Sequence, residues 1–129
     1  TMFDSDYLLY IFYTGRIYKI GLVKTRESLD RRFKQLYKNL FESDPIIRDK
    51  IKFCRVYEGM LDVDVKTCEK KVLKEFKANR LPMYGKGITE GFDYAVTLDM
   101  VTEAIDKQTR CKLNLLHKDY TPSLGEKGS

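Results

Sequence analysis

The sequence predicts an α+β fold in which helices flank a small mixed or antiparallel sheet of three to four strands. Two short runs of aromatic and branched residues, separated by Thr14-Gly15, are typical of a β-hairpin. Two longer segments carry apolar residues at helical spacing, and a third apolar run lies between them. A length of 129 residues with 43% hydrophobic residues is sized for one domain.

The elements are expected in the order strand, strand, helix, strand, helix, strand, helix. The strands are predicted at 7–13, 16–22, 51–57 and 91–96. The helices are predicted from Ser28 as cap to the Asp44-Pro45 pair, over 63–79, and after Thr97 as cap. A short helical turn is expected at 46–50 and a loop at 80–86. The domain is predicted to span 7–116, with an N-terminal tail at 1–6 and a disordered tail at 117–129.

Two charged residues occupy helical positions where the pattern favours an apolar side chain. Arg32 lies on the apolar stripe that begins at Leu29, and Glu69 interrupts the stripe that runs from Val65 to Phe76. Such violations concentrate at functional sites. A buried Arg32–Glu69 salt bridge is the alternative explanation, although a buried pair seldom gains much over apolar packing.

Tyr10 and Lys19 are expected to pair across the hairpin. Closing the turn on Tyr13 and Arg16 would place Lys19 directly opposite Tyr10, on the same face of the sheet. An ammonium group that close would favour phenolate and lower the pKa of Tyr10 below its reference value of about 10. Tyr10 could then act as a base near neutral pH. The alternative is a tyrosine hydroxyl packed beside a lysine whose charged end reaches solvent.

Positive charge is concentrated in one part of this chain, which has a net charge of +5. Residues 14–38 hold eight basic and two acidic residues, a net of +6, so the remainder carries −1. A concentrated basic region favours a polyanionic partner such as nucleic acid. A solvated basic helix face is the alternative.

The histidine and cysteine content excludes several kinds of chemistry. His117 is the only histidine, which excludes catalysis by a histidine pair, most zinc hydrolases and nucleases with a histidine–metal finger. Three distant cysteines without a Cys-x-x-Cys motif are expected to be reduced thiols of an intracellular protein, in cytoplasm or nucleus. The sequence also shows neither an apolar run of membrane-helix length nor a signal-peptide pattern.

Several of these segments resemble the motifs of the GIY-YIG nuclease superfamily, most closely its branch from phages and large DNA viruses. The resemblance covers residues 7–96. The hairpin, the helix that carries Arg32 and the helix that carries Glu69, in this order, are more specific than the hairpin motif by itself. The motifs are Leu8-Leu9-Tyr10, Lys19-Ile20-Gly21, the segment LDRRFKQL at 29–36, the segment CEKKVLKEF at 68–76, and Thr89-Glu90-Gly91-Phe92. Two departures are Leu36, where a histidine or tyrosine often stands, and the missing tryptophan after Glu90.

The resemblance implies a divalent-metal-dependent endonuclease that hydrolyses DNA phosphodiester bonds. Tyr10 would act as base or orient the attacking water, and Lys19 would stand at the first position of the second motif. Arg32 would stabilise the pentavalent phosphate, and Glu69 would hold one Mg²⁺ or Mn²⁺ ion. Tyr18 and Tyr37 are candidate auxiliary residues, and the residues expected to contact flanking phosphates are Arg16, Lys24, Arg26, Arg31 and Lys34.

Two functions without catalysis stay open at this point. A module of the same fold could bind nucleic acid without cleaving it, or a protein-interaction domain could present its basic helix to an acidic partner. For the nuclease, DNA is the expected partner and no membrane is involved. Its target choice could come from a homodimer or from a specificity domain outside this sequence.

Overall fold

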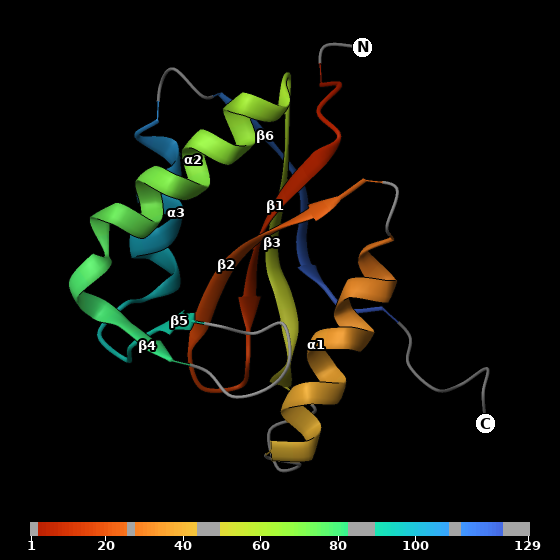
Figure 1. The fold of residues 1–129 in the computed structure, drawn as a ribbon, viewed down its shortest axis with the longest axis vertical. Helices are drawn as coiled ribbons and strands as arrows, with labels where there is room; N and C mark the ends of the chain where they lie inside the picture. Colours follow the sequence, from red (N-terminus) through yellow and green to blue (C-terminus); the bar gives the residue numbers. More distant parts are fainter. Residues whose placement is uncertain (1–2, 26–27, 44–49, 83–89, 109–111, 123–129) are drawn as a thin grey trace.

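The computed structural model describes residues 3–25, 28–43, 50–82, 90–108 and 112–122. Within these ranges single strands or pairs of strands are separated by helices along the chain (Figure 1). The strands are β1 (Tyr7–Tyr13), β2 (Tyr18–Lys24), β3 (Lys52–Gly59), β4 (Arg80–Pro82), β5 (Glu90–Phe92) and β6 (Leu113–Tyr120). The helices are α1 (Leu29–Ser43), α2 (Asp62–Glu75) and α3 (Leu98–Asp106), with a 3-10 turn at Lys77–Asn79.

Four strands form one antiparallel sheet in the order β2-β1-β3-β6, and β4 pairs with β5 as a separate antiparallel hairpin. Strands β2 and β6 are therefore the two edges of the main sheet. The predicted α+β fold with a small sheet and flanking helices is confirmed.

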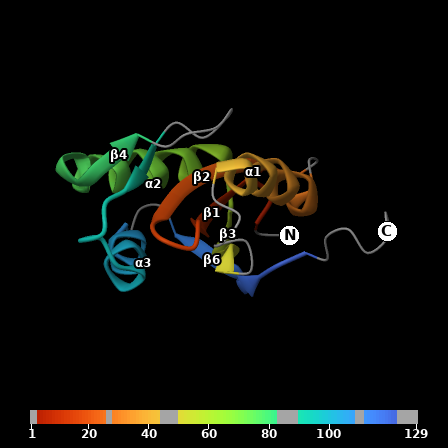
Figure 2. The same cartoon turned by 90° about the horizontal axis from the view of Figure 1, so that it is seen from below.

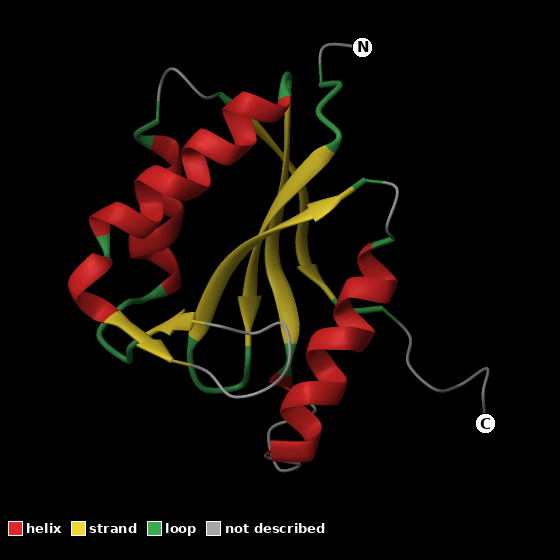
Figure 3. Cartoon of the chain, in the orientation of Figure 1, coloured by secondary structure: helices red, strands yellow, loops and turns green. Residues whose placement is uncertain are grey.

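The sheet separates α1 from the other two helices (Figure 3). Alternate residues of β1 divide between two cores, because successive side chains of a strand point to opposite faces. Tyr10 and Phe12 pack in the core that includes Phe33 of α1. Leu9 and Ile11 pack in the core formed with α2 and α3. Figures 1 and 2 both show β2 lying between α1 and α2, so one sheet edge is bordered by two helices.

Both predicted helix caps are present. The Ser28 hydroxyl accepts a hydrogen bond from the Arg31 backbone N–H at 3.1 Å, and the Thr97 hydroxyl accepts one from the Met100 N–H at 3.2 Å. Each bond satisfies one of the amide donors that a helix start leaves without an intrahelical partner. The starts of α1 and α3 are therefore determined by local sequence.

The predicted hairpin register is wrong by two residues. The Thr14 hydroxyl accepts hydrogen bonds from the backbone N–H groups of Arg16 and Ile17, and the Thr14 N–H donates to the Ile17 carbonyl at 3.0 Å. These bonds close a four-residue connection in which Gly15 takes a φ of 98°. The strands therefore close on Tyr13 opposite Tyr18, and β2 begins two residues later than predicted.

The C-terminal boundary is also corrected. Residues 113–120 form β6, which pairs with β3, so the expected disorder from 117 onward is wrong as far as Tyr120. This edge strand is largely exposed and lacks the alternation that would predict a strand. The N-terminal tail is in part docked, because the Ser5 N–H donates to the Gly59 carbonyl at 3.1 Å.

Smaller differences concern element lengths. Helix α2 ends four residues before the predicted limit and continues as the 3-10 turn, and β4 begins the segment predicted as a loop. Strand β3 extends to Gly59, and β5 is shorter than the strand predicted at 91–96. The helical turn predicted at 46–50 lies outside the described residues except for Lys50. Among the described helices, none combines the length and apolar character needed to cross a bilayer.

Candidate active site

Tyr10 lies at the centre of β1, and its side chain crosses the neighbouring edge strand. The residue is 2% exposed, and its ring contacts Phe53 edge-on at a centroid distance of 5.0 Å. Tyr10 pairs with Gly21 of β2. A Cβ atom at position 21 would lie 2.5 Å from the Tyr10 Oη atom and 2.6 Å from Cζ. The phenol can therefore lie over β2 only because position 21 is a glycine and has no Cβ atom.

Lys19 pairs with Phe12 and not with Tyr10, so the predicted direct pairing is wrong. Because the register differs by two residues, Lys19 still points to the same face as Tyr10 and lies about 7 Å along β2 from Gly21. Its side chain is half-buried.

The prediction that Lys19 lowers the pKa of Tyr10 is also wrong. Burial raises the pKa of Tyr10 to about 12, the Arg32 guanidinium lowers it, and the Glu69 carboxylate raises it. Removal of the phenol from water penalises the phenolate more strongly than one nearby cation compensates. At neutral pH the free protein therefore holds Tyr10 as a neutral phenol.

Arg32 and Glu69 act on the same phenol, although they come from different helices. Both are half-buried, next to the fully buried Phe33 of α1 and Cys68 of α2. Burial raises the pKa of Glu69, while Lys19 and Arg80 lower it. The interactions join Tyr10 to Arg32, Tyr10 to Glu69, and Glu69 to Lys19. The four predicted site residues thus share one electrostatic environment. Figure 1 shows β2, the strand that carries Lys19, between α1 and α2.

Arg80 belongs to the same environment and was missed by sequence reasoning. It is the first residue of β4, is half-buried, and follows the 3-10 turn after α2. The β4–β5 hairpin is brought to the main sheet by contact between β5 and β2. Arg80 fell in the segment predicted as a loop, where a single arginine has no periodic pattern to mark it.

The predicted auxiliary tyrosines differ in position. Tyr18 packs with the core under α2 and α3, and its ring lies 4.8 Å from that of Tyr13, so it is on the opposite face of the sheet from Tyr10. Tyr37 packs against the core under α1 and stacks on Phe33 at 6.2 Å. Only Tyr37 is therefore on the same side of the sheet as the site.

The predicted phosphate-contacting residues surround the β2 edge. Arg16 is exposed at the tip of the β1–β2 connection, and Lys24 is exposed at the opposite end of β2. Arg31 and Lys34 are exposed on α1. Arg26 lies outside the described residues. The four that are described lie on the β1–β2 connection, the edge strand β2 and the neighbouring helix α1.

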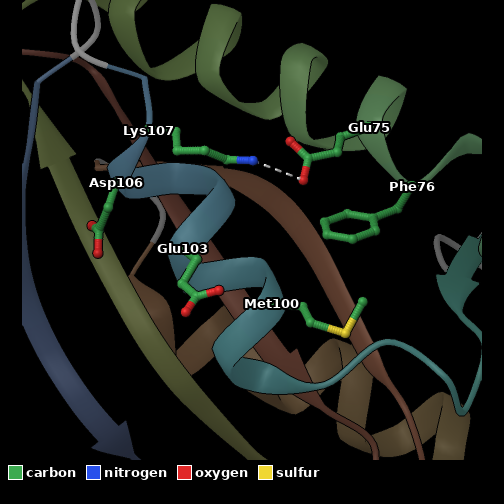
Figure 4. Close-up of a pocket in the computed structure, with 6 residues that line it drawn as sticks. All are labelled: Glu75, Phe76, Met100, Glu103, Asp106 and Lys107. Carbon is green, nitrogen blue, oxygen red and sulfur yellow. Dashed lines mark hydrogen bonds and ion pairs between the residues drawn. The ribbon is translucent and has the colours of Figure 1, made fainter.

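A hollow of about 480 Å³ lies elsewhere, between the end of α2 and α3 (Figure 4). Its apolar lining is Phe76 and Met100, and its rim carries Glu75, which is bridged by Lys107 at 3.3 Å. Glu103 and Asp106 add two more carboxylates. This acidic hollow contains none of the predicted site residues and would repel a polyanion.

One carboxylate of the site suits a divalent cation. Among the described residues, no group of three or more His, Cys, Asp or Glu side chains could share a metal ion. In the part of the chain that the structure describes, Glu69 is the carboxylate that acts on the pKa of Tyr10, as Arg32 also does. Mg²⁺ fits such a place, because it keeps several waters and is often bound through one or two carboxylates together with substrate phosphates.

No protein-family model, curated protein sequence or solved structure matches this chain. The resemblance to the GIY-YIG nucleases therefore rests on its motif residues alone.

Proposed function

We propose that the protein is a divalent-metal-dependent endonuclease that hydrolyses DNA phosphodiester bonds at the β2 edge. One observation carries the proposal. The Arg32 guanidinium of α1 and the Glu69 carboxylate of α2 both act on the pKa of the Tyr10 phenol of β1, although the three residues are far apart in sequence. Two of the three break the hydrophobic pattern of their helices, and such violations are most common where function requires them.

Arg32 is suited to the phosphate. A half-buried guanidinium donates to two oxygens of one phosphate with fixed geometry. In the transition state, negative charge grows on the non-bridging oxygens, where a donor already held in place is most effective. Arg32 would therefore bind the scissile phosphate and stabilise it as the water attacks.

Tyr10 is suited to orienting the water and not to carrying its proton away. With a pKa of about 12, only about one molecule in 10⁵ holds Tyr10 as phenolate at pH 7. The neutral hydroxyl can both donate and accept a hydrogen bond. Its fixed position over Gly21 would hold the water in line with the bond that breaks, which is a positioning contribution.

Glu69 would hold the cation, and Lys19 and Arg80 oppose the rise that burial causes in the pKa of its carboxylate. When bound there, a divalent ion polarises the phosphate and stabilises the leaving 3′ oxygen. The exposed basic residues of β2 and α1 would bind flanking phosphates without reading base sequence.

Plasmid nicking in Mg²⁺ and in Mn²⁺ tests the proposal. Glu69→Gln should lower the nicking rate by about 10²-fold or more, the cost typical of deleting one preorganised electrostatic group. Glu75→Gln is the matched control, because Glu75 lies on the same helix in an exposed ion pair with Lys107, which contributes at most about 1 kcal/mol to stability. Equal nicking by the Glu69 variant and the control would remove the metal assignment. Salt-dependent binding without nicking in either metal would instead identify a non-catalytic nucleic-acid-binding module.

A further inference from the structure

A second hollow, of about 390 Å³, lies at the far end of the same sheet edge. It is formed where β1 starts, β2 ends and α2 begins. Its lining residues are Asp6, Tyr7, Lys24, Asp62 and Lys66. The sequence motifs and the proposed chemistry do not assign a role to this hollow. Among its described lining residues, Lys24 is the one expected to contact phosphate.

Two lysines from different elements converge on the hollow. Lys24 is directly opposite Tyr7 in the β1–β2 pairing. Lys66 extends from α2, and its Nζ atom lies 4.4 Å from the centre of the Tyr7 ring. A cation held over an aromatic ring loses part of its conformational freedom before any ligand arrives. The pair is therefore a partly preorganised site for one anion.

The two carboxylates limit what this site can take. The Asp62 Oδ1 atom accepts a hydrogen bond from the Asp6 backbone N–H at 2.6 Å, and Asp62 lies in the first turn of α2, where negative charge is favoured. Asp6 is exposed. Both acids would repel a second phosphate group beyond the lysines. The lining suits a single phosphate on the lysine side of the hollow.

The hollow and the candidate active site share their supporting elements. The Tyr7–Lys24 pair is three residues, about 10 Å, along the strands from the Tyr10–Gly21 pair, and it points to the other face of the sheet edge, toward α2. Lys66 precedes Glu69 by about one turn of α2. A phosphodiester backbone that passes the candidate active site along the β2 edge would therefore also pass the hollow.

We propose that Lys24 and Lys66 form a distal phosphate subsite, which binds a backbone phosphate of the substrate on one side of the bond that is cleaved. This inference rests on the proposed nuclease function. It sets a minimum length for the substrate on one side of the cut. The carboxylates of Asp6 and Asp62 would then mark the limit of the surface along β2 that binds phosphates.

Binding and cleavage of DNA by Lys66→Gln test the subsite. Binding of a fluorescent 20-base-pair duplex is measured by anisotropy in EDTA over a range of salt concentrations, so that no turnover occurs. Loss of one phosphate contact should lower the slope of log affinity against log salt by about 0.9 and weaken binding several-fold. In Mg²⁺, KM should rise while kcat is retained. Lys24→Gln should give the same changes.

Lys71→Gln is the matched control, because Lys71 is exposed on the same helix, five residues after Lys66 and therefore on a different side. If Lys66→Gln binds with the same salt slope and cleaves with the same KM as Lys71→Gln, the subsite is refuted while the nuclease stands. If the wild type neither binds nor nicks DNA, the proposed function fails and this inference fails with it. For substrates shortened, one nucleotide at a time, until they no longer reach Lys24 and Lys66, wild type and Lys66→Gln should be cleaved equally.

Discussion

Each edge of the main sheet has a buried glycine nearby whose missing Cβ atom leaves room for neighbouring side chains, but the side chains differ in kind. At the β2 edge, Gly21 leaves room for the ring and hydroxyl of Tyr10. Near the β6 edge, Gly59 leaves room for two aliphatic side chains, because a Cβ there would lie 2.6 Å from Val65 Cγ2 and 3.1 Å from Leu113 Cδ2. Both glycines are buried in strands. One supports a polar group among charges, and the other supports apolar packing.

The surroundings of the two edges differ in the same way. Half-buried charges from three elements meet beside β2, whereas β6 exposes Leu115 at 46% and Leu116 at 41%. Charge held in a half-buried place costs free energy, and exposed leucine does not require a special explanation. The β2 edge therefore gives up stability to hold its charges, as the proposed chemistry would require. Stability and activity should respond differently to matched changes at the two edges.

The largest effect is expected from Gly21→Ala. The added methyl group would overlap a ring that is 2% exposed and backed by Phe53, so the ring has little room to retreat. Overpacking of this kind costs about 1–3 kcal/mol of unfolding free energy. A shift of the hydroxyl by about 1 Å should also lower the nicking rate by about 10²-fold. Urea denaturation and nicking assays measure the two effects.

Gly59→Ala is the control for this variant at the other edge. It should lose a similar amount of stability, because its Cβ would also meet buried side chains. Its nicking rate per folded molecule should equal that of the wild type, at a temperature well below both melting transitions. A Gly21 variant that keeps full activity, or a Gly59 variant that loses it, would break the distinction between the edges.

The alkaline stability of the protein tests the environment of Tyr10. Its pKa is about 12 in the folded protein and about 10 in the unfolded chain. Below pH 10 the phenol is protonated in both the folded and the unfolded state, so it does not lower the free energy of unfolding. As the pH rises from 10 to 12, the free energy of unfolding falls, because the unfolded chain releases the proton first and is stabilised by doing so. The loss should amount to about 2–3 kcal/mol.

Tyr10→Phe should remove this loss, so the difference in unfolding free energy between wild type and variant should change between pH 9 and pH 12. The measurement is urea denaturation at closely spaced pH values. Tyr94→Phe is the control, because that ring is 71% exposed, and its curve should run parallel to the wild type. If the Tyr10 variant also runs parallel, the phenol is not held neutral by burial.

The sequence was sufficient for elements that are determined locally. The caps at Ser28 and Thr97 and the helical stripes of α1 and α2 are local features, and they placed the helix starts to within one residue. Arg32 and Glu69 were found because they break those stripes. A shift of two residues preserves the face of a strand, so Lys19 was placed on the correct face even though its partner was wrong.

Features that depend on distant residues could not be predicted in the same way. The hairpin register is a local exception, because the Thr14 hydroxyl accepts hydrogen bonds from Arg16 and Ile17 and so favours a four-residue turn over the expected two-residue turn. Strand β6 pairs with a strand about sixty residues earlier and has no alternating pattern. The pKa of Tyr10 depends mainly on its burial, to which Phe53 contributes. The sequence-based prediction considered only a contact with Lys19 and left this burial out.

The smallest effect is expected at the end of β6, where Tyr120 contacts α1. The Tyr120 hydroxyl donates a hydrogen bond to the Asp30 Oδ1 atom at 2.5 Å, and this bond is the main reason that the pKa of Tyr120 is raised to about 12. Tyr120→Phe should lower the unfolding free energy by about 1 kcal/mol, because the bond is exposed and water replaces the lost donor. Asp30→Asn should weaken the same bond, and the double variant should lose less than the sum of the two single changes. Nicking should be unchanged in all three variants. A rate loss comparable to that of Gly21→Ala would mean that the β6 edge controls the site through α1, whose first turn also carries Arg32.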